Sequence, residues 1–150
     1  MSVRNPDAAA EQPATSAAWT VGQRLRTGSE IFATYWQARW WLFRLSFPAA
    51  VATARDVATT LAGPSAADQR TTAGIRLGRA VDRTLRLVPF DSRCLVKALV
   101  LTRMLSRRGI DTTFVIGVRP RPDFAAHAWL ERDGVALLPT GDGFHRLSEL

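Results

Sequence analysis

The chain has 150 residues, 47% of them hydrophobic, and a formal net charge of +7. This length fits one domain with a single core, and the hydrophobic fraction is typical of a globular protein. The single cysteine excludes a disulfide within the chain, so an oxidising compartment is not required. Every basic residue except Lys97 is an arginine. The arginines are scattered and no nucleic-acid-binding motif accompanies them, so we expect a solvated surface or an acidic partner, and no nucleic acid.

Composition divides the chain into three parts. Residues 1–18 are polar and rich in alanine and lack the basic start and apolar stretch of a signal peptide, so we expect a disordered tail and a cytoplasmic protein. We expect residues 19–66 to form a helical region that packs on the core or on a partner, and residues 67–150 to form the core itself. Helices come first and a meander of strands follows, which predicts an α+β fold.

The stretch from Trp19 to Val57 is predicted to be helical. Apolar and aromatic residues recur there at helical spacing, and Trp36, Trp40, Trp41 and Phe43 give this stretch most of the aromatic mass of the chain. Pro48 is expected to kink or end a helix.

The aromatic residues of this stretch have three interpretations. They pack on the core, they form a surface that docks a partner, or they contact a membrane interface. Arg39 and Arg44 interrupt the run of ~18 uncharged apolar residues that a spanning helix needs. We therefore expect no stable membrane insertion, and we favour packing on the core.

A second helical segment follows a linker. Residues 61–68 have the composition of a linker. Apolar residues three and four apart then predict a helix over about residues 70–87, and Pro89 closes it.

The only cysteine, Cys94, lies at the start of the next predicted helix. Asp91 and Ser92 supply N-cap chemistry before it, and Gly109 is the expected C-cap. On the inward stripe of this helix, Cys94 is either a small buried hydrophobe or a nucleophile. The N–H groups and the dipole of a helix N-terminus stabilise a thiolate and can bind an oxyanion.

Three strands are predicted after this helix. The first covers residues 112–118, and the second covers residues 124–132. Asp133-Gly134 predicts a two-residue hairpin turn, and a third strand then returns over residues 135–140.

His127 lies in the second predicted strand and alternates on one face with Trp129 and Glu131. It is either a core histidine bonded to Glu131 or the general base for Cys94, and the presence of both residues favours a nucleophile with its base. His145 lies in a polar segment and is expected at the surface. Two histidines and one cysteine do not make a convincing zinc site, so neither a metal nor another cofactor is implied.

The predicted hairpin offers two candidate groups that could orient the imidazole. In a two-residue hairpin Trp129 faces Leu138 and His127 faces Thr140, and Asp142 lies on the same face, one diagonal step further. We therefore expect Asp142 to be the third catalytic residue. Thr140 is the nearer alternative, but it is uncharged.

These motifs resemble the leader peptidases of lasso-peptide biosynthesis, which belong to the transglutaminase-like superfamily. The resemblance covers about residues 75–147. Its motifs are Arg93-Cys94-Leu95, a helix ending in Arg107-Arg108-Gly109, the segment from Phe114 to Val118, and the segment from Phe124 to Glu131.

The resemblance implies a transglutaminase-like or papain-like fold, in which residues 67–150 are the catalytic core and the cysteine helix packs on a small antiparallel sheet. It implies a cysteine protease with Cys94 as nucleophile and His127 as base. The implied partners are a precursor peptide with its leader, a small leader-binding protein and an ATP-dependent macrolactam synthetase. The aspartate of the family falls nearer to Pro139 than to Asp142, so the resemblance does not assign the third residue.

Two other functions fit the same residues. One is a peptide-binding relative that kept the fold and lost a competent triad. The other is an acyltransferase that uses the same thioester chemistry with a different second nucleophile.

Overall fold

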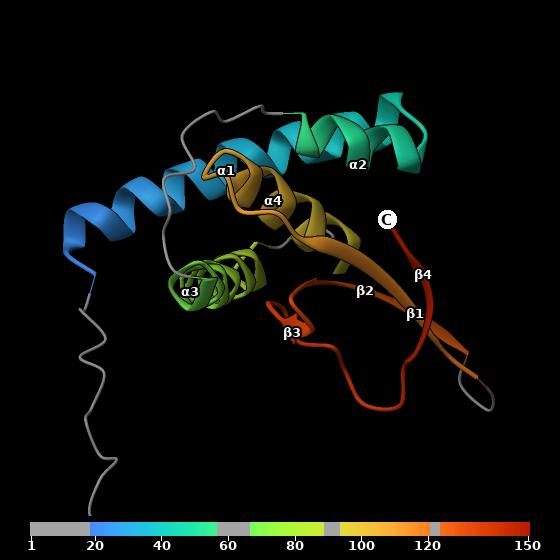
Figure 1. Ribbon diagram of the computed structural model, residues 1–150. Coiled ribbons are helices and arrows are strands. Elements are labelled where there is room, and N and C mark those ends of the chain that lie inside the picture. The colour runs from blue at the N-terminus through green and yellow to red at the C-terminus, as the bar shows by residue number, and fades with distance from the viewer. Residues whose placement is uncertain (1–18, 57–66, 89–93, 121–123) are drawn as a thin grey trace, which may run out of the picture.

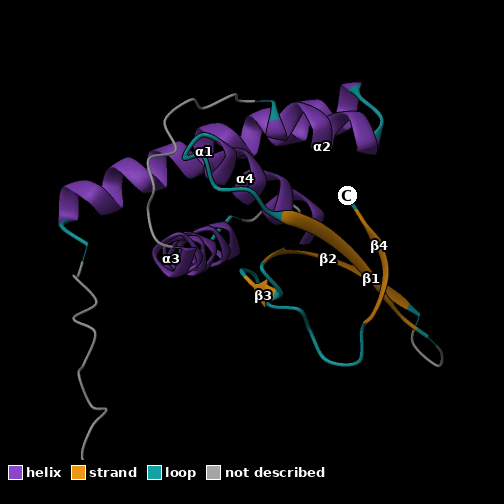
Figure 2. Cartoon of the chain, viewed as in Figure 1, coloured by secondary structure: helices purple, strands orange, loops and turns teal. Residues whose placement is uncertain are grey.

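The computed structural model describes residues 19–56, 67–88, 94–120 and 124–150. Within these ranges the chain forms four helices and one four-stranded antiparallel sheet (Figure 1, Figure 2). The predicted α+β class is confirmed. The predicted tail and most of the predicted linker lie outside the described residues.

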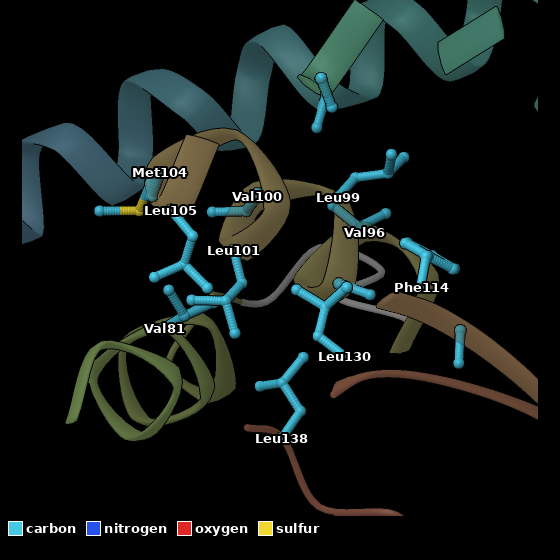
Figure 3. Close-up of a cluster of buried hydrophobic side chains, with 14 of the residues drawn as sticks. Val81, Val96, Leu99, Val100, Leu101, Met104, Leu105, Phe114, Leu130 and Leu138 are labelled. Carbon is cyan, nitrogen blue, oxygen red and sulfur yellow. The ribbon is translucent and has the colours of Figure 1, made fainter. Parts of the chain in front are cut away.

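Helix α4 (Cys94–Ser106) is the centre of the core (Figure 3). The sequence predicts one inward stripe, but the other three helices and the sheet all pack against α4. A helix that is apolar on every side is stable only when it is enclosed in this way. Its fully buried apolar side chains are Ala98, Leu99, Val100, Leu101, Met104 and Leu105.

The C-terminus of α4 confirms the predicted glycine cap. Gly109 has a φ of 64°. The amides of Gly109 and Ile110 donate to the carbonyls of Ser106 and Leu105, which satisfies two carbonyls that the helix leaves unpaired. The predicted N-cap residues Asp91 and Ser92, and Pro89 before them, lie outside the described residues.

The predicted N-terminal helical stretch is two helices, α1 (Val21–Arg44) and α2 (Phe47–Arg55). Thr20 begins α1 with a capping box, and residues 45–46 are not helical and separate α1 from α2. Pro48 stands in the first turn of α2, where its missing N–H costs no hydrogen bond. A helix does end before Pro48, as expected, but the proline helps to begin the next helix.

The aromatic residues of α1 divide between two faces of the helix. Tyr35 and Trp41 are buried in the core. In contrast, Trp36 is 58% exposed, Trp40 is 56% exposed and Phe43 is 83% exposed. The favoured prediction, a helix packed on the core, is therefore confirmed for the side of α1 that carries Trp41, but it is wrong for the side chains of Trp36, Trp40 and Phe43.

Helix α3 (Ala67–Arg86) packs on the core and contacts Leu137, which is distant in the sequence. Its buried apolar face has the predicted spacing, with Leu77, Val81 and Leu85. Gly74 and Gly78 lie one turn apart and face Leu137. A Cβ at Gly78 would stand 1.9 Å from the main-chain oxygen of Leu137, so only glycine permits this approach.

The sheet has the strand order β3-β2-β1-β4. Strands β1 (Thr113–Arg119) and β2 (Ala125–Arg132) lie within two residues of their predicted bounds. Asp133 and Gly134 both have positive φ and form the predicted turn, which pairs Arg132 with Val135.

Two features of the sheet differ from the prediction. Strand β3 (Val135–Ala136) has only two residues, so the predicted strand over residues 135–140 is wrong beyond Ala136. The chain then leaves the sheet and returns as β4 (His145–Glu149), which was not predicted and which pairs with the free edge of β1.

The contact between α3 and Leu137 predicts that one methyl group added at Gly78 lowers the stability of the protein. We expect Gly78→Ala to lower the free energy of unfolding by about 1–3 kcal/mol, because the new Cβ must displace main chain. The matched control is Gly28→Ala in α1, where nothing lies within 4 Å of the added Cβ. That change should raise stability by about 0.5–1 kcal/mol, since alanine is the better helix former. Urea unfolding measures both, and equal effects would contradict the close approach.

Candidate active site

Cys94 is the first residue of α4 and is half-buried. Its side chain packs against the hydrophobic core, and the first turn of a helix carries amide groups that no carbonyl within the helix accepts. Among the described residues, the thiol makes no hydrogen bond to His127. Cys94 thus has the helix-terminus setting of the predicted nucleophile, and its pairing with His127 stays a prediction.

His127 lies on β2, opposite Gly117 of β1. Its ring stacks with Trp129 at a centroid distance of 5.9 Å and contacts Phe144 at 5.2 Å. Aromatic groups thus flank the imidazole and restrict its rotation. Gly117 leaves room for this arrangement, because a Cβ there would stand 2.6 Å from the Trp129 ring.

Glu131 does not hold the imidazole. Its carboxylate accepts a hydrogen bond of 2.7 Å from the indole N–H of Trp129 and forms an ion pair with Arg146. The interpretation of His127 as a core histidine bonded to Glu131 is therefore wrong.

The imidazole is held instead by a main-chain carbonyl. His127 Nε2 lies 2.8 Å from the oxygen of Pro139. A carbonyl oxygen can only accept a hydrogen bond, so in this pairing Nε2 is the protonated nitrogen. Nδ1 of the neutral ring then carries the free lone pair, which is the state that a general base requires.

Two anchors set the position of the Pro139 carbonyl. The amide of Leu137 donates to the carbonyl of Leu130 over 2.8 Å, and the main chain at Leu137 fits against Gly78. Leu138 is buried beside them (Figure 3). The Pro139 carbonyl, which follows Leu138, therefore belongs to a segment that is fixed on both α3 and β2.

The predicted orienting side chains of Asp142 and Thr140 do not bind the ring. The pairs expected for Leu138 and Thr140 do not form, since the β2–β3 ladder ends at Ala136. Asp142 is exposed and lies in a turn. Within the described part of the chain, neither Asp142 nor Thr140 donates to or accepts from the His127 ring. The sequence held one signal of this outcome: a proline at position 139 disfavours a continued strand.

Two further expectations concern the end of the chain. His145 is exposed, as predicted, and begins β4. Phe144, which the sequence analysis did not single out, packs on His127, and the guanidinium of Arg119 lies 5.3 Å from the Phe144 ring centroid.

The comparison with protein families matches residues 32–149 to a model described as transglutaminase-like superfamily. The chain belongs to the transglutaminase-like superfamily. The match runs from within α1 to the end of β4 and therefore includes all of the site described above.

A curated relative matches a shorter part of this transglutaminase-like chain. It is the microcin J25-processing protein McjB of Escherichia coli, with 47% identity over 45 residues. The aligned stretch covers 30% of the present chain and only 21% of the relative. No solved structure matches the chain.

The carbonyl contact predicts the tautomer of His127. We expect nitrogen-15 NMR of the neutral ring to show the proton on Nε2, because the Pro139 oxygen cannot donate. His145→Gln leaves His127 as the only histidine and so assigns the signal. Asp142→Asn and Thr140→Val should leave the nitrogen shifts unchanged. A proton on Nδ1, or a clear shift in Asp142→Asn alone, would instead support the carboxylate.

Proposed function

We propose that this protein is a cysteine peptidase that removes the leader from a ribosomally synthesised lasso-peptide precursor in the cytoplasm. The observation that carries the proposal is the His127 ring, whose Nε2 is held by the Pro139 carbonyl and whose Nδ1 is left to act as a base. Family membership, the single cysteine at a helix N-terminus and the partial match to a microcin-processing protein support it.

The proposed chemistry begins with Cys94. Its thiol gives a proton to His127, and the thiolate attacks the scissile carbonyl. Amides in the first turn of α4 stabilise the oxyanion. The imidazolium then protonates the leaving amine, a thioester forms, and water hydrolyses it with His127 again as the base. The thiol and the imidazole approach each other when substrate binds, because catalytic hydrogen bonds are often long in free enzymes.

The Pro139 carbonyl, which takes the third position of the proposed site, carries no net charge, unlike a carboxylate. A carbonyl fixes the ring and its tautomer, but it stabilises an imidazolium less than an aspartate does. We propose that Pro139 takes this positioning role through its main chain. Asp142 remains the predicted carboxylate, which must move towards the ring to take part.

One observation favours a second candidate function. Among the described residues, no carboxylate is hydrogen-bonded to His127. This fits a peptide-binding relative that does not cut its ligand. An acyltransferase differs from the peptidase only in the group that resolves the thioester.

The α1 aromatic face supports the proposed partner. It is a stripe of exposed side chains along one side of the helix, comprising Phe32, Trp36, Trp40 and Phe43. Aromatic and arginine side chains dominate the energetics of many protein interfaces, and the Arg44 guanidinium lies 5.8 Å from the Trp40 ring centroid. No described helix is long and apolar enough to cross a membrane. We assign this face to the small leader-binding protein, which delivers the precursor before the macrolactam synthetase acts.

Cleavage is tested with purified protein, precursor and leader-binding protein, followed by mass spectrometry of the products. Cys94→Ala and His127→Ala should abolish cleavage, whereas His145→Ala, the matched histidine control, should retain it. We expect Cys94→Ala to cost about 1 kcal/mol of stability, because alanine fills most of a small site. Cleavage by Cys94→Ala would remove Cys94 from the mechanism. A leader whose new terminus carries an added amine instead of a free carboxylate would identify an acyltransferase.

The α1 aromatic face is tested by binding of the leader-binding protein in isothermal titration calorimetry. Trp36→Ala and Trp40→Ala should each weaken binding about tenfold or more, as is usual for buried aromatic residues at an interface. Phe124→Ala is the matched control, because Phe124 is 73% exposed and lies directly before β2, away from α1 in the sequence. Equal binding by all three variants would place the partner elsewhere. Partition of the folded protein into vesicles of neutral lipid would identify a membrane-binding face instead.

A further inference from the structure

An open cavity of about 580 Å³ lies between α1 and α3, apart from the residues of the candidate active site. Its floor is apolar, because it is formed by the half-buried side chain of Ala80, with the core residue Ile31 beneath it. Trp19 forms one wall. The cavity therefore offers a place for an apolar side chain next to the core.

The rim of the cavity is strongly basic. No described aspartate or glutamate lines it, whereas four arginines do: Arg24, Arg76, Arg79 and Arg83. The guanidinium of Arg76 lies 5.8 Å from the centroid of the Trp19 ring. Among the described residues, Arg24, Arg79 and Arg83 have no ion pair. Their positive potential is therefore left uncompensated at one place on the surface.

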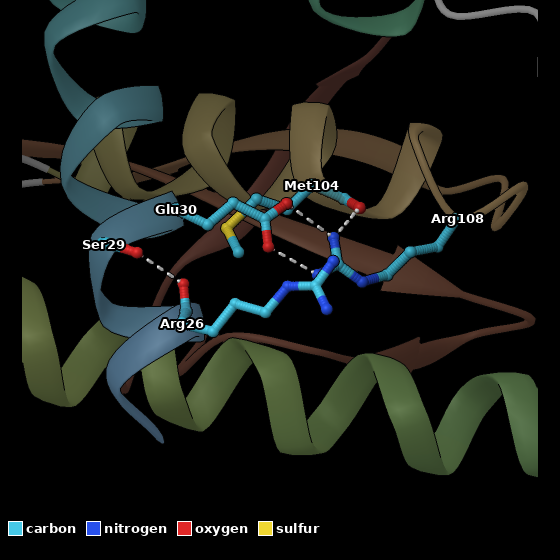
Figure 4. A network of polar contacts seen from close by, with 5 residues as sticks. All are labelled: Arg26, Ser29, Glu30, Met104 and Arg108. Carbon is cyan, nitrogen blue, oxygen red and sulfur yellow. Dashed lines mark hydrogen bonds and ion pairs between the residues drawn. The ribbon is translucent and has the colours of Figure 1, made fainter. Parts of the chain in front are cut away.

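Two carboxylates on the helices that form the cavity, Glu30 and Asp82, pair with other cations. Glu30 of α1 binds Arg108 through two contacts, of 2.7 and 3.0 Å (Figure 4). Asp82 of α3 pairs with Arg86 at 2.6 Å and with Lys97 of α4 at 3.0 Å. Burial acts to raise the pKa of Asp82, but its bonds to Lys97 and Arg86 outweigh this effect and hold the pKa below its usual value. Neither carboxylate neutralises the cavity.

We infer that the cavity between α1 and α3 docks an acidic segment of a separate polypeptide, whose carboxylates pair with Arg24, Arg79 and Arg83 and whose apolar side chain packs on Ala80 and Trp19. A basic rim over an apolar floor matches a segment that carries both kinds of side chain. Nucleic acid fits less well, because bases need aromatic faces on which to stack and one face of Trp19 is already occupied by Arg76. The inference does not depend on Cys94 being a nucleophile.

The probe is a fluorescein-labelled peptide of glutamate, serine and leucine, and fluorescence anisotropy measures its binding. All proteins carry Cys94→Ala, so peptide cleavage cannot affect the result. We expect the peptide to bind, and its glutamine counterpart to bind about tenfold more weakly or less. Arg79→Glu and Arg83→Glu should each weaken binding of the acidic peptide about tenfold or more. Arg79→Gln and Arg83→Gln should weaken it less than the charge reversals do.

The matched control is Arg107→Glu, which makes the same change in net charge at an exposed position after α4. It should change binding by about twofold at most, because a charge outside the cavity is screened by salt. An equal loss in Arg107→Glu would show general attraction to a basic protein and overturn the inference. So would the absence of binding by the acidic peptide, or equal binding of the glutamine peptide.

Two further arms identify other occupants. Tighter binding by a short single-stranded RNA, with the same dependence on Arg83, would assign the cavity to nucleic acid. Stronger peptide binding after Asp7→Asn with Glu11→Gln would assign the cavity to the N-terminal segment of this chain. Circular dichroism and thermal unfolding of each variant confirm that it is folded.

Discussion

The burial of α4 on nearly every side is the constraint on which the rest of the structure depends. An isolated helix with apolar residues all round exposes a large apolar surface to water, which costs roughly 25 cal/mol per Å². Three helices and the sheet cover α4 together. Its first residue, Cys94, consequently lies at the boundary between the core and the surface, with its side chain half-buried.

The placement of the imidazole depends on a different kind of contact. The chain after β3 leaves the sheet because Leu137 fits against the glycines of α3 and Leu138 enters the core. This path directs the carbonyl of Pro139 to His127. A main-chain oxygen thus supplies the contact for which the sequence predicted a carboxylate, and the role depends on the path of the chain more than on a side chain.

The sides of helix α1 differ in what they contact. Ile31 and Tyr35 attach it to the core, while the α1 aromatic face remains exposed. Near its N-terminal end, the helix forms one wall of the basic cavity with α3. Exposed aromatic groups are costly to leave in water, and uncompensated arginines raise the local potential. Contact with other molecules would account for both of these surfaces.

The sequence by itself determined the elements whose signals are local. These are α4 with its glycine cap, the buried face of α3, strands β1 and β2, and the turn at Asp133-Gly134. Each depends on residues within a few positions of one another, so spacing and turn chemistry were sufficient.

Only the tertiary structure decided the rest. The periodicity of α1 could not distinguish the inward side from the outward side, because both carry aromatic residues. Strand β4 is exposed throughout and has no apolar alternation, and it forms because β1 offers a free edge. The end of β3 and the contact between Pro139 and His127 depend on the fit of Leu137 against Gly78, two residues 59 positions apart in the chain. Such contacts follow from packing in three dimensions, for which a local pattern carries no signal.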